Sequence, residues 1–371
     1  MQIKDVINHL ESLSPLQYAE GFDNVGLLTG QVDWEVKGVL VTLDTLEETV
    51  DEAIIKNCNF IVSFHPIIFN GLKRLTGKSY VERTVIKAIQ NNIAIYALHT
   101  ALDNQKIGVS GKMAAMLGLH DVKVLIPKSE TIKKLTTYVP IQNVDQVRRA
   151  LFSVGAGNIG NYAECSFNSE GYGTYTANAQ ANPTLGEIGK WHQEPETALV
   201  VYFEKHLEAA ILKALFQSHP YEEVAYEIYS IENAHQNIGL GMIGELENPM
   251  NEKDFLLFVK EKMQTESIRH TAFLGKPIKK VAVLAGSGSF AIKNALAAEA
   301  DAFLTADLKY HNFYEAENQL LLADIGHFES ERYTKNYIVD FLRKKILNFA
   351  PVSPFGEIIL SEENTNPVKY L

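Results

Sequence analysis

The sequence is poor in cysteine and has no surplus of basic residues, and each shortage excludes a class of protein. Its 371 residues include only two cysteines, Cys58 and Cys165, which lie far apart and have no CxxC neighbour. A disulfide framework and a thiolate zinc site are therefore not expected. Acidic residues outnumber basic ones by 45 to 34, and both signs are interspersed along the chain. A nucleic-acid surface, which would need a basic stripe, is not expected either.

Long hydrophobic runs are also missing. No stretch reaches the ~20 apolar residues that a membrane span requires, so no membrane partner is expected. The first residues, MQIKDVINHLESL, have the spacing of an amphipathic helix and lack the apolar segment of a signal peptide. These features favour a cytoplasmic protein.

What is present is the composition of a globular protein, with 46% apolar and 21% charged residues. The length exceeds what one hydrophobic core usually serves, which favours two or three domains.

The first third alternates short apolar runs with segments of helical periodicity. KGVLVTLD, NFIVSFHP and IAIYALHT read as buried strands, and residues 45–56, 80–92 and 106–119 read as helices. Strands joined by helices of this length indicate crossover connections and a mostly parallel or mixed sheet.

The pattern changes near residue 131 and returns after the segment GLGMIGELE. Between these points a strand, a helix, a Gly/Asn/Ser/Tyr-rich stretch at 155–189, a strand, a helix and a strand follow one another, as in a ferredoxin-like α+β module. The polar stretch is predicted to be a long hairpin or loop. We therefore predict an α/β fold made of residues 1–130 and 239–371, interrupted by an inserted module at 131–238, with one long final helix at about 329–347.

Imidazoles and carboxylates gather at the predicted strand ends. His65 ends NFIVSFHP, where Pro66 keeps it extended and stops the strand. His99 ends IAIYALHT, and Asp103 follows in the adjoining turn. Sites in open α/β sheets are built at the carboxyl ends of the strands, so these side chains are candidates for one shared site.

The second half supplies matching residues. Asp307 ends DAFLTAD, and His327 follows LLLADIG, with Glu331 four residues later. His327 and Glu331 would project from the same helix face, and the N-terminus of that helix would keep Glu331 ionised. Imidazole and carboxylate ligands without thiolates suit zinc, manganese or iron, bound as one ion or as a bridged pair.

Each signal alone has an ordinary structural explanation. A histidine before a proline often caps a strand, HTALD could be a turn with an aspartate helix cap, and HxxxE spacing arises by chance on exposed helices. The position of all these residues near the predicted strand ends is what indicates a metal site.

Five segments resemble one known family. SFHPIIF, LHTALDN, DIGHFESE, FDNVGLLTG and TADLKYHNFYEA are similar, in order and spacing, to the signature segments of the dinuclear-metal-centre hexamer family, the GTP cyclohydrolase 1 type 2 homologues. SHPYEEVAYEIY resembles the motif of the PII-like middle domain in longer bacterial members.

The resemblance implies two similar α/β halves, a homohexamer shaped as a hollow toroid, and paired metals. It carries metal binding onto His65, Asp103, His327 and Glu331, with Glu331 as the bridge. Members usually have two consecutive histidines before the proline, but the first is Phe64 here. Since phenylalanine cannot bind metal, one ion loses a nitrogen ligand. His99 could replace that nitrogen or hydrogen-bond a ligand.

Other polar residues carry weaker predictions. Asp307 and His311, four apart, could line the site or start a solvated helix. The GSGS segment at 286–289 could cradle a phosphate, although a plain tight turn is favoured because the other fingerprint residues are missing. His219 is assigned to a turn that packs the insert, and His192 receives no role.

Two functions follow from these observations. The first is a metal-dependent hydrolase acting on a phosphoester or nucleotide-type substrate, with His99 or His311 as a proton shuttle. The second is a non-catalytic hexameric assembly that stores, delivers or senses metal. In either case the inserted module could bind a small molecule and gate access to the metal.

Overall fold

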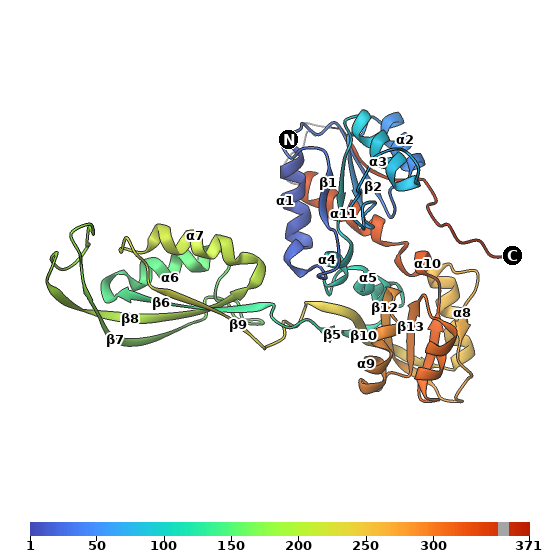
Figure 1. Cartoon of the computed structure of the whole chain (residues 1–371). Helices are drawn as coiled ribbons and strands as arrows, with labels where there is room; N and C mark the ends of the chain where they lie inside the picture. The colour runs from blue at the N-terminus through green and yellow to red at the C-terminus, as the bar shows by residue number, and fades with distance from the viewer. Residues whose placement is uncertain (348–355) are drawn as a thin grey trace. The chain divides into compact units, whose positions relative to one another are not determined.

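The computed structural model describes residues 1–347 and 356–371 of the chain. It divides into two compact units, Met1–Pro127 with Asn237–Leu371 and Lys128–Gln236 (Figure 1). The architecture is mixed α/β with three sheets, as predicted. None of the helices in the described ranges is long and apolar enough to cross a membrane.

The first sheet of the larger unit is built around parallel strands from the N-terminal third. Its order is β1 (Gly26–Thr29), β4 (Ala94–Ala97), β3 (Phe60–Ser63), β2 (Val39–Thr42) and β15 (Ile358–Leu360). Only β1 is antiparallel to its neighbour. The strands β2, β3 and β4 are buried throughout, which explains why they read as continuous apolar runs.

The two faces of this sheet are covered by different helices. Leu40 and Ile61 belong to a cluster that includes Val50 of α2 (Glu47–Ile55) and Val85 of α3 (Tyr80–Gln90). The neighbouring strand positions face a larger cluster that also takes in α1 (Ile3–Leu13) and α11 (Thr334–Leu347). The alternation of side chains along each strand therefore divides the core into two layers.

The second sheet of the larger unit comes mainly from the C-terminal third. Its order is β11 (Arg269–His270), β14 (Leu321–Asp324), β13 (Ala302–Ala306), β12 (Ile278–Ser287), β10 (Gly239–Met250) and β5 (His120–Pro127). The strands β12, β13 and β14 are parallel. Two helices come from the same third of the chain, α8 (Glu252–Met263) and α9 (Ile292–Ala297). A third, α5 (Val109–Met116), comes from the N-terminal third and contacts β10 and β12.

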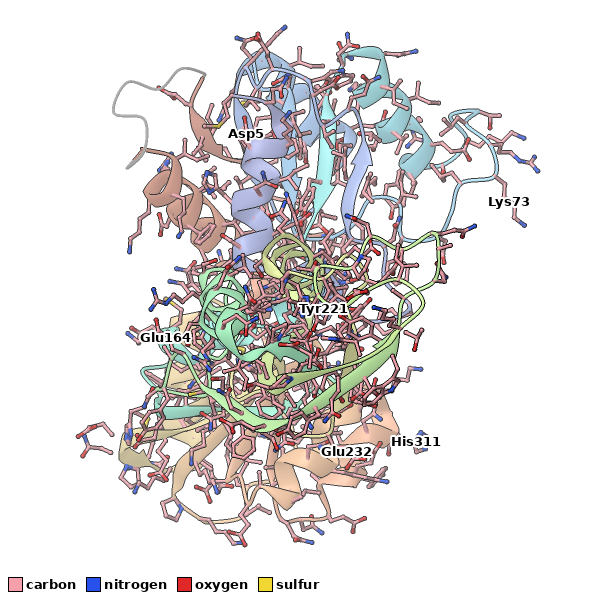
Figure 2. All side chains as sticks on the ribbon, turned by 90° about the vertical axis from the view of Figure 1, so that its left-hand side faces the viewer. Asp5, Lys73, Glu164, Tyr221, Glu232 and His311 are labelled. Atoms are coloured by element: carbon pink, nitrogen blue, oxygen red, sulfur yellow. The ribbon has the colours of Figure 1, made fainter. Side chains whose placement is uncertain are left out.

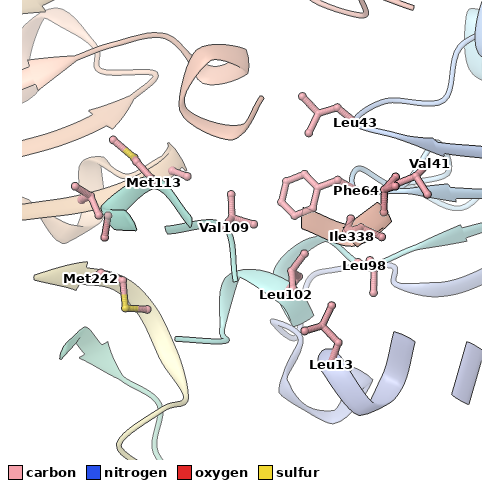
Figure 3. Close-up of a cluster of buried hydrophobic side chains, with 14 of the residues drawn as sticks. Leu13, Val41, Leu43, Phe64, Leu98, Leu102, Val109, Met113, Met242 and Ile338 are labelled. Atoms are coloured by element: carbon pink, nitrogen blue, oxygen red, sulfur yellow. The ribbon is translucent and has the colours of Figure 1, made fainter. Parts of the chain in front are cut away.

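A single hydrophobic cluster joins the two sheets. It contains Val41 and Phe64 from the first sheet and Met242 from the second, with Met113 of α5 and Ile338 of α11 (Figure 3). Because this core is continuous, the carboxyl ends of β3 and β14 are held in a fixed relation to each other.

The long final helix predicted at 329–347 is wrong in one respect: it is broken. The structure has α10 (His327–Glu331) and a separate α11 (Thr334–Leu347). Both residues at the break are held by the end of α8: Arg332 donates to the carbonyl of Gln264, and the Tyr333 hydroxyl donates to that of Lys262. This anchoring separates the turn that carries Glu331 from the helix that packs in the core.

The smaller unit runs in the order strand, helix, strand, strand, helix and strand. Its elements are β6 (Ile132–Pro140), α6 (Val144–Ser153), β7 (Ser166–Thr176), β8 (Trp191–Glu204), α7 (Glu208–Ser218) and β9 (Tyr226–Ile231). The sheet order is β7-β8-β6-β9, and every pair is antiparallel. The polar stretch at 155–189 supplies one long arm of the hairpin β7–β8.

Both helices of the smaller unit lie on one face of its sheet. Leu199 and Val201 of β8 share a cluster with Val147 of α6 and Ile211 of α7. Glu196 and Ala198, whose positions have the opposite parity on β8, therefore face the side without helices.

Candidate metal centre

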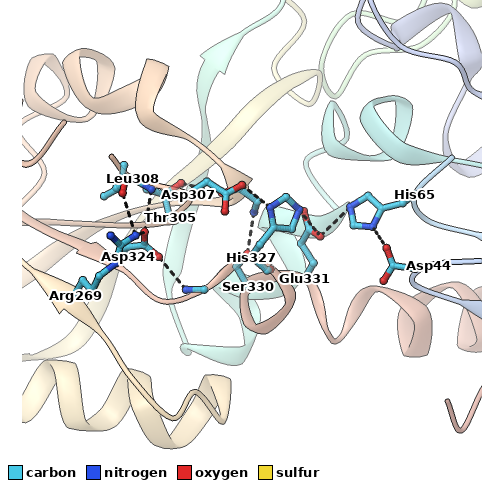
Figure 4. A network of polar contacts seen from close by, with 12 residues as sticks. Asp44, His65, Arg269, Thr305, Asp307, Leu308, Asp324, His327, Ser330 and Glu331 are labelled. Atoms are coloured by element: carbon cyan, nitrogen blue, oxygen red, sulfur yellow. Dashed lines mark hydrogen bonds and ion pairs between the residues drawn. The ribbon is translucent and has the colours of Figure 1, made fainter. Parts of the chain in front are cut away.

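Three side chains converge where the two sheets of the larger unit meet. His65, His327 and Glu331 each offer one donor atom, and these atoms lie within 4.8 Å of one another (Figure 4). The Nε2 atoms of both histidines are 3.2 Å from Glu331 Oε2. That oxygen is inaccessible to solvent and accepts no well-aligned hydrogen bond within the described part of the chain. Three donor atoms this close together could hold a metal ion.

Local backbone structure explains how these residues reach that point. His65 lies two residues beyond β3, where its N–H donates to the carbonyl of Leu43. His327 begins α10 directly after Gly326, which has a φ of +92° and ends the extended segment from β14. Glu331 lies one helical turn later, so it shares a face with His327.

The outer nitrogens of both imidazoles are bound by carboxylates. His65 Nδ1 lies 2.8 Å from Asp44 Oδ1, and His327 Nδ1 lies 2.7 Å from Asp307 Oδ2. The second oxygen of Asp44 accepts from the Thr365 hydroxyl at 2.6 Å. A carboxylate on Nδ1 fixes the ring orientation and leaves the lone pair of neutral Nε2 directed inward, as in many protein metal sites.

The charges in the cluster shift one another's protonation. Burial would lower the pKa values of His65 and His327, but the charge of Glu331 outweighs it and raises both pKa values well above the ordinary one. Burial would raise the pKa of Glu331, but the two imidazoliums outweigh it and lower that pKa.

Asp103 is the fourth predicted ligand, and it lies beside the three. It ends the short helix α4 (His99–Asp103), so the alternative of an aspartate N-cap is wrong. Its Oδ1 is shielded from solvent and accepts no hydrogen bond from any described residue. Burial and the charge of Glu331 both raise its pKa well above the ordinary value. A buried carboxyl oxygen without a donor fits a position that a cation would fill.

Gly286 makes room for this arrangement, and the sequence argument missed its role. It has a φ of +70°, and a Cβ there would lie 2.4 Å from Glu331 Oε1. Its N–H donates to the Ser330 hydroxyl at 2.8 Å. The glycine of the GSGS segment therefore supports the carboxylate, and its amide is not free to cradle a phosphate.

His99 faces the cluster from the first sheet. Its ring centroid is 5.4 Å from that of His65, and its Nδ1 bonds Asp23 Oδ1 at 2.7 Å. Burial would raise the pKa of Asp23, but hydrogen bonds from His99 and Thr100 lower it, so the carboxylate stays charged. His99 has a φ of +32°, an uncommon conformation for a residue other than glycine.

Phe64 lies in the hydrophobic core and is not one of the three converging side chains. It is fully buried, with its ring centroid 5.7 Å from that of His99 (Figure 3).

The remaining predicted residues are placed as follows. Asp307 is the partner of His327, whereas His311 is exposed and packs on Tyr310 and Tyr314 (Figure 2). His311 forms no hydrogen bond or ion pair with the cluster within the described ranges. Asp307 itself has a φ of +57°, so the two residues do not share a helix face.

A cavity of about 450 Å³ lies in front of the cluster. Its lining includes His65, His327 and Arg269, and the C-terminal residues Val368 and Tyr370 form part of its wall. Arg269 is the only lysine or arginine in this lining, and it also bonds Asp324 and the carbonyl of Leu308. The donor atoms are thus within reach of a small molecule.

Comparisons with known proteins identify the family. The model of the Duf34/NIF3 (NGG1p interacting factor 3) family matches residues 1–367. The chain therefore belongs to the Duf34/NIF3 family, which confirms the resemblance.

Its relatives span the whole chain. It is 38% identical to a GTP cyclohydrolase 1 type 2 homolog of Bacillus subtilis over 99% of this chain and 98% of that one, and 33% identical to one of Staphylococcus epidermidis over the full length of both. The crystal structure of a Bacillus cereus protein related to NIF3 matches with a TM-score of 0.86 and 34% identity, covering 100% and 99% of the two chains. A Staphylococcus aureus structure matches with a TM-score of 0.76 and 30% identity over the same shares.

Sequence reasoning did not find Asp44, Asp23 or Gly286. Asp44 directly follows the apolar run of β2, so the strand-end signal that selected His65 could have selected it too. Asp23 lies in the motif FDNVGLLTG, but nothing in its spacing indicates a partner at position 99. Their roles depend on contacts between distant segments.

Proposed function

We infer that the protein is a divalent-metal-dependent hydrolase whose centre is held by His65, His327, Glu331 and Asp103. The observation that carries this inference is the pair of 3.2 Å separations between the two Nε2 atoms and Glu331 Oε2, with no aligned hydrogen bond between them. Two imidazoles and two carboxylates suit zinc, manganese or iron. A bound divalent cation would supply Lewis acidity and hydroxide near neutral pH.

Different residues would orient the ligands, supply negative charge and transfer a proton. Asp44 and Asp307 hold the Nδ1 protons and so keep both Nε2 lone pairs inward. Glu331 and Asp103 supply the negative charge. His99, held by ionised Asp23 through Nδ1, can take up or release a proton at Nε2. His311, which packs among tyrosines, is the weaker candidate for that task.

One group of the cavity would favour an anionic substrate: Arg269 is its only lysine or arginine, and Asp44, Asp307, Asp324 and Glu329 share the lining. Arg269 places a guanidinium in the same lining as the two histidines, and guanidinium groups recognise phosphate oxygens well. The volume of about 450 Å³ suits a nucleotide-sized molecule. The names of the B. subtilis and S. epidermidis relatives also direct attention to guanine nucleotides.

The second candidate is a non-catalytic hexameric assembly that stores, delivers or senses metal. Burial of Phe64 favours it, because the apolar ring leaves a second ion short of a nitrogen ligand. A centre that holds one ion strongly would be a poor two-metal catalyst.

Turnover separates the two candidates. Protein loaded with zinc, manganese or iron is assayed on nucleotides, phosphoesters and cyclic amidines, alongside Glu331→Gln and His99→Gln. A hydrolase requires turnover that Glu331→Gln loses together with metal, while His99→Gln lowers kcat at unchanged metal content. Fully loaded protein without turnover on any of these substrates would contradict catalysis and support the storage role.

A further inference from the structure

A second cavity lies wholly within the smaller unit and has no part in the metal centre. Its volume is about 710 Å³, within the range of small-molecule sites. It lies against the helix-free face of the sheet, because Glu196 and Ala198 line it while Leu199 and Val201 face α6 and α7. The loop after α7, which carries the SHPYEE segment, supplies Tyr221 to its wall (Figure 2).

The lining combines aromatic rings with negative charge. It contains four tyrosines and four glutamates, and it contains no lysine, arginine or histidine. Tyr175 and Tyr221 lie edge to face with their centroids 6.2 Å apart. Aromatic faces beside carboxylates attract cations, and the attraction is stronger in partly desolvated surroundings.

Glu196 is the buried acidic residue of this cavity. Its side chain is buried, with 8% of the residue exposed, although glutamate is seldom buried without a partner charge. Its Oε1 accepts from the Tyr221 hydroxyl at 2.8 Å, whereas Oε2 accepts no hydrogen bond from the residues that the structure describes. Gly173 of β7 makes room for this oxygen, since a Cβ there would lie 2.2 Å from it.

The neighbouring histidine does not neutralise Glu196. His219 Nε2 donates to the carbonyl of Tyr138 at 3.0 Å, and its Nδ1 accepts from the N–H of Tyr221 at 3.1 Å. This pattern uses both nitrogens of a neutral imidazole. Burial lowers the pKa of His219 further than its hydrogen bond and Glu196 raise it, in agreement with the neutral form. The histidine of SHPYEE therefore fixes Tyr221, and the negative charge of Glu196 has no cationic partner in the cavity.

We propose that this cavity binds a small organic cation, an alkylammonium or guanidinium group, against Glu196 Oε2 and the tyrosine rings. A bare metal ion fits less well. Only His65, His327 and Glu331 form a three-ligand group among the described residues, so the glutamates here do not converge as metal ligands do. The aromatic wall instead offers contact area for an organic group.

The proposal is tested on the full-length protein with two probe cations, choline and agmatine, and a neutral control. The control is 3,3-dimethylbutan-1-ol, which has the shape of choline without its charge. Binding is followed by saturation-transfer NMR and titration calorimetry. At least one cation should bind saturably with a Kd below about 10 mM, and the neutral alcohol should bind at least about tenfold more weakly.

Three variants locate the site. Glu196→Gln keeps the acceptor for Tyr221 but removes the charge, and should weaken cation binding about tenfold or more. Tyr172→Leu removes an exposed ring of the lining and should weaken it several-fold without affecting the fold. Glu187→Gln is the control: Glu187 is an exposed partner of Lys190 and does not line the cavity, so binding should be unchanged.

Three results would overturn the proposal. They are the absence of saturable binding by either cation, equal binding of choline and its neutral analogue, and equal losses in Glu196→Gln and Glu187→Gln. If Glu196→Gln does not fold, the comparison of choline with the alcohol and the Tyr172→Leu variant still decide the question.

Discussion

The histidines of the metal centre use both ring nitrogens, and this is the feature on which the site depends. In each histidine, Nε2 lies 3.2 Å from Glu331 Oε2, and Nδ1 bonds a carboxylate, Asp44 for His65 and Asp307 for His327. The ligands themselves stand out in the sequence as strand-end histidines, but the carboxylates behind them do not. Their spacing from the histidines, 21 and 20 residues, follows from the length of the intervening elements and not from a local motif.

Removing one of these carboxylates should weaken metal binding without breaking the fold. Asp307→Asn keeps the side-chain shape, and asparagine tolerates the φ of +57° at this position. We expect zinc affinity to fall about 10- to 100-fold, as losses of such partners do. Competition with a chromophoric chelator measures it. Asp51→Asn, which alters an exposed partner of Lys87, is the control, and an equal effect of both changes would contradict the assigned role.

Gly286 offers a test in which backbone strain is matched. Gly286 and Gly275 both have a φ of +70°, but a Cβ at Gly275 meets nothing within 4 Å whereas one at Gly286 meets Glu331. Alanine at either position should cost about 1 kcal/mol in backbone strain, and Gly286→Ala should lower the free energy of unfolding, measured in urea, by more because its Cβ displaces the buried carboxylate. Only Gly286→Ala should also lose zinc affinity, by at least about tenfold. Unchanged affinity in Gly286→Ala would show that the Glu331 carboxylate is not confined there.

At the scale of elements, the strands that position the site could be predicted from the sequence because they are buried on both faces. Strands β2, β3 and β4 of the first sheet and β12, β13 and β14 of the second have apolar runs, and polar residues follow their carboxyl ends. The break between α10 and α11 was not readable. It depends on carbonyls at the end of α8, about 70 residues away along the chain, that accept from Arg332 and Tyr333. The strand β15 was missed because three residues carry no periodicity.

One prediction concerns how the C-terminal segment is held to α2. The Glu52 carboxylate accepts from the N–H of Glu362 and the hydroxyl of Ser361, and Lys56 lies 3.0 Å away. Burial would raise the pKa of Glu52, but these donors outweigh it and lower the pKa below its ordinary 4.5. A lowered folded-state pKa contributes stability above about pH 4.5 that is lost as the pH falls through the folded pKa.

Glu52→Gln should therefore be less stable than the unmodified protein by about 1–2 kcal/mol at pH 7. The difference should shrink as the pH is lowered below about 4.5. Urea unfolding at pH 7, 5 and 4 measures it, with Glu48→Gln, an exposed change on the same helix, as the control. A difference that stays constant over this range would mean that charge on Glu52 does not hold the segment.

At the scale of the whole molecule, the metal centre joins residues from the two ends of the sequence. His65 follows β3 of the first sheet, and His327 and Glu331 lie on α10, which follows β14 of the second. Neither sheet alone would present the three converging side chains, so the continuous core between the sheets is a condition for the candidate site. The sequence could select His65 and His327 as candidates because each follows a strand. It could not predict the direction of each donor atom, which the packing of the two sheets decides.

Phe64 should set the number of ions per chain. A buried phenylalanine cannot replace an imidazole, so the unmodified protein should bind about one zinc ion strongly, and Phe64→His should bind about two. Elemental analysis after equilibrium dialysis gives the count, and Phe64→Leu controls for the change in the core. Two strongly bound ions in the unmodified protein would show that His99 or solvent completes a second site.

The central claim, that His65, His327 and Glu331 bind one cation together, is tested most directly by anomalous diffraction from zinc-loaded crystals on both sides of the zinc edge. The account predicts an anomalous peak at about 2.0–2.2 Å from His65 Nε2, His327 Nε2 and a Glu331 oxygen, with the Asp103 carboxylate beside it. Zinc-loaded crystals with no peak at this point, or with zinc bound only by other residues, would contradict it.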